Sequence, residues 1–263
     1  MSKGTISLVI PALNEERGIE ATIRRVPKEV TEVIVVDGAS ADATVERARA
    51  AGAKVIIEPK RGYGLAYRRG FEAATGDIIA TADADGTYPT EMIPIVAEYL
   101  ERKRLWFVNC SRFPLSDARS MRSINKLGNI GMSLFATALY LHPFRDIASG
   151  MWVFRRDILE RMELHTQGWE FSNEIKLEAF FLGPQHFGEF VVPYDERVGE
   201  THNQTIWRTG SLVLGFMAYE RFRHFIRGRV IDPRASVRSN ESQFEEEPSP
   251  LSSGRIAAPS KHV

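Results

Sequence analysis

The sequence has very little cysteine and no surplus of charge of either sign. Its 263 residues include one cysteine, Cys110, which excludes a disulfide framework and a multi-cysteine metal site and suits a reducing compartment. The 34 basic and 34 acidic residues cancel, so no global field attracts the protein to nucleic acid. Nucleic acid is therefore not an expected partner, and any anion site has to be local.

Long hydrophobic runs are also missing. The longest uncharged apolar stretch covers residues 127–141, which is shorter than the roughly 20 residues that a membrane-spanning helix needs. We expect a buried helix there and no transmembrane segment. The N-terminal sequence MSKGTISLVIP has a single lysine and meets a proline too early for a secretory signal.

Strand and helix patterns alternate through the first hundred residues. Short apolar runs predict strands over residues 5–11, 32–38, 53–59 and 77–85, and capped segments with helical spacing predict helices over 14–27, 40–52, 62–76 and 89–103. Strands separated by helices of this length predict an α/β fold with a Rossmann-like, mostly parallel sheet flanked by helices. A C-terminal helix is expected over about 205–229. Residues 232–263, rich in proline, serine and charge, are predicted to be a disordered tail.

Polar side chains occur where the predicted strands end. They are Asn14 and Glu15 after the first strand, Asp37 at the end of the second, Arg61 after the third, and Asp83 and Asp85 at the end of the fourth. Parallel α/β sheets bind ligands beyond the carboxyl ends of their strands. The convergence of four polar segments on one edge predicts a ligand site there.

The segment ADADGTYP, residues 82–89, places two carboxylates one residue apart. Side chains at positions i and i+2 of an extended segment point the same way, and a hard cation such as Mg²⁺ or Mn²⁺ binds oxygens of this kind. The cation would hold the phosphates of a nucleotide and neutralise the charge on a departing diphosphate. The same string also occurs as a solvated turn, but its position at a strand end favours the metal site.

The remaining strand-end residues are weaker signals. Asp37 either ends a strand or accepts a hydrogen bond from a nucleobase. The segment KRGYGLAYRRG is neither a P-loop nor a dinucleotide fingerprint, because its glycines stand only at 62, 64 and 70. It either brings Arg61 and a helix N-terminus to a phosphate or is a helix entry without a ligand.

Six segments in this order carry a resemblance to a known family: VIPALNEE, VIVVDGASADAT, GYGLAYRRGFEAATGDII, DADGTYP, DIASGMWVFRR and YDERVGETH. They resemble the family-two glycosyltransferases with the GT-A fold, and most closely the branch that moves sugar from a nucleotide onto a polyprenyl phosphate, such as the dolichyl-phosphate mannose synthases. The resemblance covers about residues 5–205. We expect one GT-A domain over 1–231, with a nucleotide-sugar-binding half (1–105), an acceptor half (106–204) and an amphipathic helix (205–231).

The resemblance implies donor-side roles residue by residue. Pro11, Asn14 and Glu15 match the first nucleotide-binding loop, and Asp37 matches the residue that contacts the base. The metal-binding Asp-x-Asp pair is matched by Asp83, near the ribose and the metal, and by Asp85, the more direct ligand.

On the acceptor side, the resemblance places Glu174 where the family has a carboxylate after an aromatic residue, and it matches Arg197 to a basic residue that engages phosphate. The family usually has a lysine near position 202, where this chain has His202, which is largely neutral at pH 7. The full set of candidates for gripping an acceptor phosphate is Arg112, Arg122, Lys126, Arg197 and His202. The alternative for each of these residues is a charged surface residue without a role in binding the acceptor.

The implied reaction is an inverting displacement at the anomeric carbon of the sugar. A lipid phosphate acceptor is already an anion and needs no general base, whereas a hydroxyl acceptor needs a carboxylate to take its proton. Asp146 and Glu174 are the candidates for that base, beside Asp85 as the catalytic metal ligand. Both also have structural interpretations, Asp146 as a turn cap and Glu174 as an ion-pair partner.

The predicted helix 205–229 has Tyr219, Phe222, Phe225 and Ile226 on one arc and charged residues on another. Such a helix either lies in a membrane interface or packs its aromatic face on the domain. A lipid substrate favours the first interpretation, and the expected location is cytoplasmic, with peripheral attachment at the inner face of the membrane.

The sequence thus predicts a metal-dependent glycosyltransferase that takes its sugar from a nucleotide sugar and passes it to a polyprenyl phosphate. Two alternatives stay open. One is transfer to a hydroxyl acceptor on a glycan or small molecule, and the other is a non-catalytic nucleotide-sugar-binding protein that kept the fold.

Overall fold

The computed structural model describes residues 4–115, 117, 120–198 and 206–228. The predicted tail 232–263 and the candidate His202 lie outside the described residues. Among the helices of the described part, none is both long enough and apolar enough to span a bilayer.

The core of the fold is one seven-stranded sheet with the order β3-β2-β1-β4-β6-β5-β7. The strands are β1 (Ile6–Ala12), β2 (Glu32–Asp37), β3 (Lys54–Ile57), β4 (Ile78–Thr81), β5 (Phe107–Ser111), β6 (Trp152–Arg155) and β7 (Phe187–Val191). All neighbouring strands are parallel except at β6, which is antiparallel to both β4 and β5. The predicted α/β, mostly parallel sheet is therefore confirmed.

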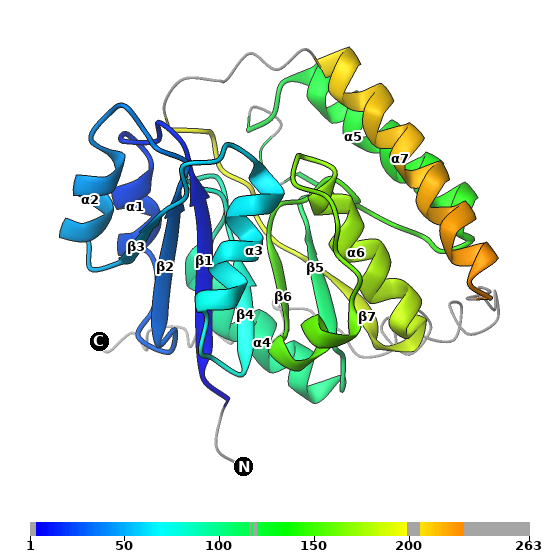
Figure 1. Cartoon of the computed structure of the whole chain (residues 1–263), viewed down its shortest axis with the longest axis horizontal. Coiled ribbons are helices and arrows are strands. Elements are labelled where there is room, and N and C mark those ends of the chain that lie inside the picture. Colours follow the sequence, from blue (N-terminus) through cyan, green and yellow to red (C-terminus); the bar gives the residue numbers. More distant parts are fainter. Residues whose placement is uncertain (1–3, 116, 118–119, 199–205, 229–263) are drawn as a thin grey trace, which may run out of the picture.

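Helices cover both faces of this sheet (Figure 1). They are α1 (Ile19–Arg24), α2 (Thr44–Ala50), α3 (Tyr63–Ala73), α4 (Ile93–Arg102), α5 (Ser123–Tyr140), α6 (Phe171–Leu182) and α7 (Ile206–Ile226), with short 3₁₀ turns at Thr90–Met92, Arg156–Arg161 and Pro184–His186. Buried residues of α3 and α6 form one core with the sheet, and those of α1, α2 and α4 form the other. The elements are shorter than the sequence patterns suggested, since β4 ends at Thr81 and not at residue 85.

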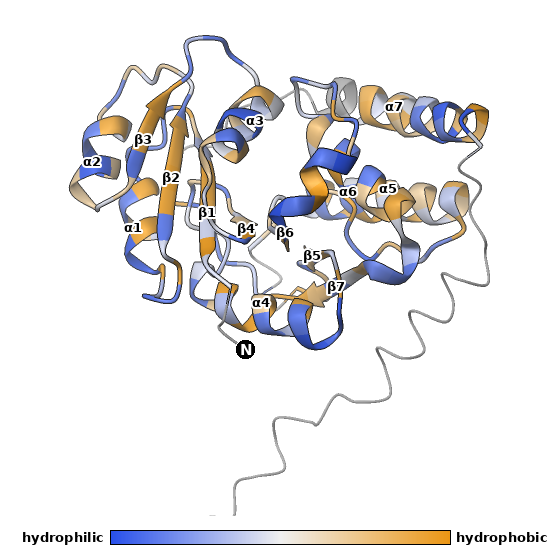
Figure 2. Cartoon of the chain, turned by 60° about the horizontal axis from the view of Figure 1, so that its bottom comes forward, coloured by the Kyte–Doolittle hydropathy of each residue, from blue (hydrophilic) through white to orange (hydrophobic). Residues whose placement is uncertain are grey.

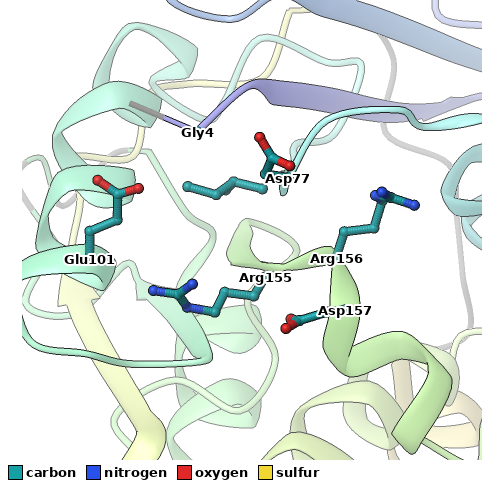
Figure 3. A pocket seen from close by; sticks show the side chains of 7 residues that line it. Gly4, Asp77, Glu101, Arg155, Arg156 and Asp157 are labelled. Carbon is teal, nitrogen blue, oxygen red and sulfur yellow. The ribbon is translucent and has the colours of Figure 1, made fainter. Parts of the chain in front are cut away.

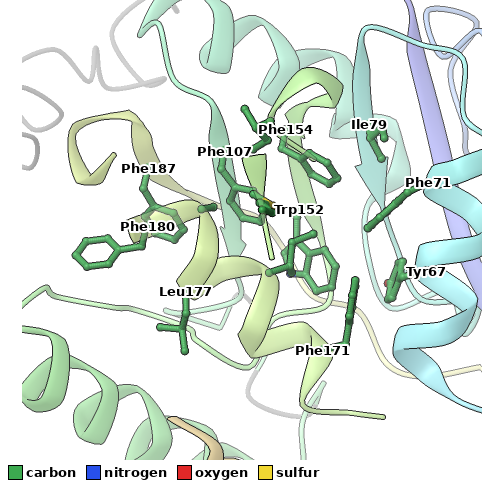
Figure 4. Close-up of a cluster of buried hydrophobic side chains, with 14 of the residues drawn as sticks. Tyr67, Phe71, Ile79, Phe107, Trp152, Phe154, Phe171, Leu177, Phe180 and Phe187 are labelled. Carbon is green, nitrogen blue, oxygen red and sulfur yellow. The ribbon is translucent and has the colours of Figure 1, made fainter. Parts of the chain in front are cut away.

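Aromatic side chains dominate the core between the sheet and α6 (Figure 4). Trp152, Phe154 and Phe107 from the strands meet Phe171 and Phe180 from α6, all without solvent exposure. Phe107 and Phe154 stack with ring centres 5.4 Å apart. Large apolar side chains buried on this scale each stabilise the fold by about 1.5–3 kcal/mol, so α6 is a rigid support for whatever its N-terminal end holds.

Strand order changes direction at β1. The chain runs from β1 outward to β2 and β3, and then returns to pair β4 with the other side of β1. The carboxyl ends of β1 and β4 therefore flank the topological switch point, where open α/β sheets bind their ligands. The polar residues predicted after these two strands lie at this point.

Helices α5 and α7 lie side by side outside the sheet layer (Figure 1). The expectation that residues 127–141 form a buried helix is wrong, because Leu127 and Leu134 of α5 are 72 % and 65 % exposed. The aromatic arc of α7 also faces outward, as Phe222 and Phe225 are 60 % and 61 % exposed. Figure 2 shows apolar segments on both helices.

Candidate active site

Asp85 is held firmly in the turn that follows β4. Its carboxylate Oδ1 accepts hydrogen bonds from the backbone N–H of Thr87 at 3.1 Å and from the hydroxyl of Thr87 at 2.7 Å. Gly86 between them has φ +78°, a left-handed conformation that favours glycine. The side chain of Asp85 is buried, and these bonds leave its Oδ2 atom to other partners.

Arg197 is the partner of that second oxygen. Its guanidinium Nη1 lies 2.7 Å from Asp85 Oδ2, and its Nη2 pairs with the carboxylate of Glu15. The backbone N–H of Val198 donates to the carbonyl oxygen of Asp85 at 3.0 Å, which keeps the segment carrying Arg197 beside the turn. One cation thus bridges the acids that follow β1 and β4.

The pKa of Glu15 depends on both charged partners in this bridge. Burial raises the pKa of Glu15 to about 7, the charge of Arg197 opposes this rise, and the charge of Asp85 adds to it. A carboxyl group that titrates near neutral pH is sensitive to any further cation that enters the site.

Asp83 lies on the side of the site formed by α3 and β6. Its Oδ1 accepts a hydrogen bond from the hydroxyl of Tyr63 at 3.2 Å. A Cβ atom added to Gly150 would lie only 2.9 Å from Asp83 Oδ2, so the backbone at Gly150 touches the carboxylate. Burial raises the pKa of Asp83 to about 7, with the charge of Asp85 as the second cause. The two aspartates are therefore close enough to interact.

The loop after β1 is locked to the loop before α2. Asn14 has φ +54°, and its backbone N–H donates to the hydroxyl of Ser40 at 2.8 Å while its side-chain oxygen accepts from the N–H of Ala41 at 2.8 Å. The N–H of Glu15 donates to the hydroxyl of Thr44 at 2.8 Å. The short polar residues of SADAT, residues 40–44, thus fix the first loop of the site.

The structure places the other three donor-side candidates, and their roles in donor binding stay predictions. Asp37 is fully buried, and both its carboxylate oxygens accept hydrogen bonds from Ser40, which closes the turn after β2. Pro11 lies within β1, opposite Val36. Arg61 is exposed at the turn that precedes α3.

Asp146 and Arg112 form a buried ion pair. The guanidinium of Arg112 donates to both carboxylate oxygens of Asp146, at 2.6 and 2.8 Å, and the backbone N–H of Arg112 adds a third bond at 3.0 Å. The charge of Asp146 raises the pKa of Arg112 against the opposing effect of burial. The contacts favour a structural role for both residues over the expected roles of Asp146 as a base and Arg112 as a phosphate ligand.

Glu174 is also engaged. Its carboxylate accepts hydrogen bonds from the backbone N–H groups of His165 at 2.8 Å and Thr166 at 3.0 Å, and from the hydroxyl of Thr166 at 2.6 Å. With 1 % of its surface exposed, Glu174 anchors the segment before α6. This arrangement favours a structural role over the catalytic one that we expected.

Two acceptor candidates belong to the outer helices. Arg122 is the exposed N-cap residue of α5, and Lys126 lies one turn further along the same helix. They lie on the helix that also carries the exposed side chains Leu127 and Leu134.

A second acidic group lies between α6 and α7. Glu178, Glu220 and His224 bring possible ligand atoms within 4.8 Å of one another. The guanidinium of Arg223 also contacts both carboxylates, at 2.6 Å from Glu220. Because the guanidinium of Arg223 already contacts both carboxylates, we interpret the group as the ion-pair network that attaches α7 to α6.

A charged cavity of about 360 Å³ lies at the opposite edge of the sheet (Figure 3). Its lining includes Asp77, which precedes β4, whereas Asp83 follows the same strand. The other charged residues of the lining are Glu101, Arg155, Arg156 and Asp157, so the lining has mixed charge. The cavity is therefore separate from the acidic edge.

Comparison with known proteins decides the family. The model of the glycosyl transferase family 2 matches residues 7–162. The chain belongs to this family. The predicted family and the prediction of a glycosyltransferase enzyme are thereby confirmed.

Curated relatives of this family-2 glycosyltransferase include two with a dolichyl or dolichol phosphate in their names. A dolichyl-phosphate hexose transferase of Haloferax volcanii is 33 % identical over 74 % of this chain and 85 % of the relative. A low-salt glycan biosynthesis hexosyltransferase of the same organism is 34 % identical over 78 % of this chain and 52 % of the relative, so this chain spans about half of that protein. A dolichol-phosphate mannosyltransferase of Pyrococcus furiosus is 26 % identical over 66 % of this chain and 53 % of the relative.

Solved structures agree on the fold. Glucosyl-3-phosphoglycerate synthase from Mycobacterium tuberculosis, in complex with Mn²⁺, UDP-glucose and phosphoglyceric acid, has a TM-score of 0.65 and 24 % identity, with 83 % of this chain and 79 % of that chain covered. The likeness confirms the expected GT-A fold.

Proposed function

We propose that this glycosyltransferase moves a sugar from a nucleoside diphosphate sugar to a polyprenyl phosphate at a membrane surface, with Mg²⁺ or Mn²⁺ bound at Asp83 and Asp85. One observation supports a phosphate acceptor over a hydroxyl acceptor. Both carboxylates expected as bases are occupied, Asp146 by Arg112 and Glu174 by backbone N–H groups. A phosphate acceptor is already ionised and needs no base, whereas a hydroxyl acceptor does. The names of the dolichyl-phosphate relatives agree with this choice.

The residues at the end of β4 fit a hard divalent cation. Asp83 and Asp85 offer carboxylate oxygens, the ligands that Mg²⁺ and Mn²⁺ prefer. When bound, the metal supplies positive charge to the departing diphosphate. Asp85 is oriented for this by Thr87, and the first loop, fixed by its bonds to residues 40–44, forms the adjacent wall for the nucleotide.

Arg197 has a second task in this mechanism. If Asp83 and Asp85 held a metal, the guanidinium of Arg197 would lose its contact with Asp85 and would become available to bind a phosphate group. Arginine suits that task because its planar guanidinium binds phosphate with two N–H groups. Arg197 is thus a candidate phosphate ligand that lies beside the proposed metal ligand Asp85.

The exposed apolar surface of α5 and α7 supports the membrane part of the proposal. We call this the α5/α7 surface; its members that are more than half exposed are Leu127, Leu134, Leu141, Leu212, Tyr219, Phe222, Phe225 and Ile226. Large contiguous apolar surfaces of this kind mark protein or membrane interaction sites. Basic residues at the start of α5 add attraction to anionic headgroups.

A transfer assay tests the function. Purified protein is incubated with Mn²⁺, a panel of UDP- and GDP-sugars and a short-chain polyprenyl phosphate, and both the released nucleoside diphosphate and the lipid product are measured. We expect glycosylated lipid phosphate and no product with free sugars or 3-phosphoglycerate. Transfer to hydroxyl acceptors alone would establish the hydroxyl alternative, and donor binding without any turnover would establish a binding protein.

A further inference from the structure

Lys176, in the middle of α6, is an ionisable side chain with no solvent exposure. Its Nζ donates to the carbonyl oxygen of Ser149 at 2.7 Å and to the hydroxyl of Ser172 at 3.1 Å, and it lies 5.4 Å from the centre of the Trp152 ring. Burial lowers the pKa of Lys176 to about 7. Burying an ammonium group costs stability, and an apolar residue would fill the same space without that cost.

The peptide that Lys176 contacts is held from several sides. The carbonyl oxygen of Ser149 accepts a further bond from the indole N–H of Trp152 at 2.8 Å. The N–H of the next residue, Gly150, donates to the hydroxyl of Tyr88 at 2.7 Å. A bond from a charged donor is about twice as strong as one between neutral groups, so the Lys176 ammonium is the strongest of these donors.

The far side of this peptide touches the proposed metal and donor site. A Cβ on Gly150 would meet both carboxylate oxygens of Asp83, at 2.9 and 3.1 Å, and the hydroxyl of Tyr63 at 3.2 Å. The carboxylate of Asp83 therefore occupies the space that a side chain at position 150 would fill, and the position of the Ser149–Gly150 peptide limits where this carboxylate can lie. Displacements of this size affect catalysis because reacting groups need precise placement.

We propose that Lys176 is a positioning residue for sugar transfer, which holds the Ser149–Gly150 peptide against Asp83 and so fixes this carboxylate toward the donor. The inference rests on the proposed function and adds a residue that neither the motifs nor the family match had indicated. Lys176 is not a catalytic residue, because it touches the peptide and not the reacting groups.

The charges that face Lys176 come from four elements. They are Asp146 after α5, Arg112 after β5, Glu189 on β7 and Asp83 after β4. Arg112 and Asp146 neutralise each other, and Glu189 is bonded to the side chain of Asn109 at 2.8 Å. Loss of the Lys176 proton would thus weaken the bond to Ser149 while the neighbouring pairs stay in place.

The test compares Lys176→Met, which keeps the length of the side chain, with Lys28→Met at an exposed lysine. Binding of Mn²⁺ with UDP, and in parallel with GDP, is measured by calorimetry, and transfer is measured from pH 6 to 8.5. We expect Lys176→Met to raise both the nucleotide Kd and the donor KM about tenfold, because Asp83 is no longer held in one position, with a much smaller change in kcat. The wild-type to variant ratio of kcat/KM should fall as pH rises, because the wild type loses its ammonium.

The outcomes separate this inference from the function on which it rests. An active wild type with a Lys176→Met variant that matches Lys28→Met, or with a ratio that stays constant across pH, overturns the positioning role alone. A wild type that binds neither nucleotide contradicts the proposed function as well. If Lys176→Met does not fold, Gly150→Ala moves Asp83 directly. A raised donor KM then supports the linkage, and an unchanged one overturns it.

Discussion

Arg197 and Asp85 are 112 residues apart in the sequence, and their side chains form a 2.7 Å ion pair at the carboxyl edge of the sheet. The same guanidinium contacts Glu15 after β1. On the proposed function, a metal held by Asp83 and Asp85 would compete with Arg197 for the carboxylate of Asp85. The ion pair would then weaken the binding of the metal, and metal binding would free the guanidinium for a phosphate.

Removing the guanidinium should separate these two effects. In Arg197→Ala, we expect Mn²⁺ without nucleotide to bind more tightly, because Asp85 and Glu15 no longer have an internal counterion. We expect transfer to fall by about 10²-fold or more, since a phosphate ligand is lost. Mn²⁺ affinity is measured by electron paramagnetic resonance and transfer by lipid product formation.

Arg24→Ala is the matched control for this prediction. Arg24 is an exposed arginine of α1 whose guanidinium pairs with Glu20 on the same helix. It should leave Mn²⁺ affinity unchanged. Weaker Mn²⁺ binding in Arg197→Ala would contradict the competition between the two cations.

Glu174→Gln tests whether this carboxylate is structural or catalytic. Glutamine offers one acceptor oxygen where the carboxylate accepts three hydrogen bonds through two. We expect a loss of about 1–3 kcal/mol of stability for the buried N–H left without a partner. The corresponding fall in Tm is roughly 2–4 °C per kcal/mol, while kcat stays within a few-fold of the wild type. A kcat lower by about 10³-fold at an unchanged Tm would instead identify Glu174 as the base.

The sequence predicted the acidic edge because parallel strands deliver their carboxyl ends to one place. Asp83 and Glu15 could be assigned to the edge from strand patterns alone. The partners of the acids could not be assigned, because pairs such as Arg112 with Asp146 are made by tertiary packing and leave no periodic pattern. The backbone N–H groups of His165 and Thr166 that bond to Glu174 are likewise brought there by the fold and leave no signal in the sequence.

Asp83 should make the stability of the metal-free protein depend on pH. Its pKa is raised from 3.8 to about 7 in the folded state, so between these values the folded protein binds more protons than the unfolded one. The contribution of Asp83 to the free energy of unfolding then decreases as pH rises toward 7, and above pH 7 no part of this contribution remains. We expect Asp83→Asn to have a Tm advantage over the wild type that grows between pH 5 and pH 8.

Differential scanning calorimetry across this pH range checks the prediction. Asp157→Asn, at an exposed position beside the opposite cavity, is the control and should leave the pH dependence of Tm unchanged. Glu15 contributes in the same direction, since its pKa is also raised to about 7, so part of the slope should remain in Asp83→Asn. An unaltered slope in that variant would show that Asp83 is ionised in the free protein.

The α5/α7 surface should bind vesicles. We expect the double variant Phe222→Glu with Phe225→Glu to lose cosedimentation with vesicles of phosphatidylglycerol and phosphatidylcholine, because both exposed rings become charged. Transfer to a detergent-solubilised short-chain acceptor should be largely retained. Ile95→Glu on α4, where the isoleucine is 54 % exposed, is the matched control and should still bind. Equal vesicle binding by all three proteins would exclude this surface as the membrane contact.

The orientation of α7 shows why its amphipathic pattern was ambiguous. Its charged arc meets Glu178 of α6 through Arg223 and the buried His224, and this contact turns the aromatic arc outward. A helical wheel identifies the two arcs but not which one the domain covers. That choice depended on a glutamate more than forty residues away on another helix.

The most direct test of the central claim is Mn²⁺-dependent transfer by Asp85→Asn beside Asp157→Asn. Asparagine keeps the oxygen that Thr87 contacts and removes the charge that would bind the metal, so the fold should persist, with a lower Tm because the ion pair to Arg197 is lost. We predict that transfer by Asp85→Asn falls by about 10³-fold or more at every Mn²⁺ concentration, while Asp157→Asn retains full activity. Unchanged turnover and unchanged Mn²⁺ dependence in Asp85→Asn would contradict a metal site at the end of β4.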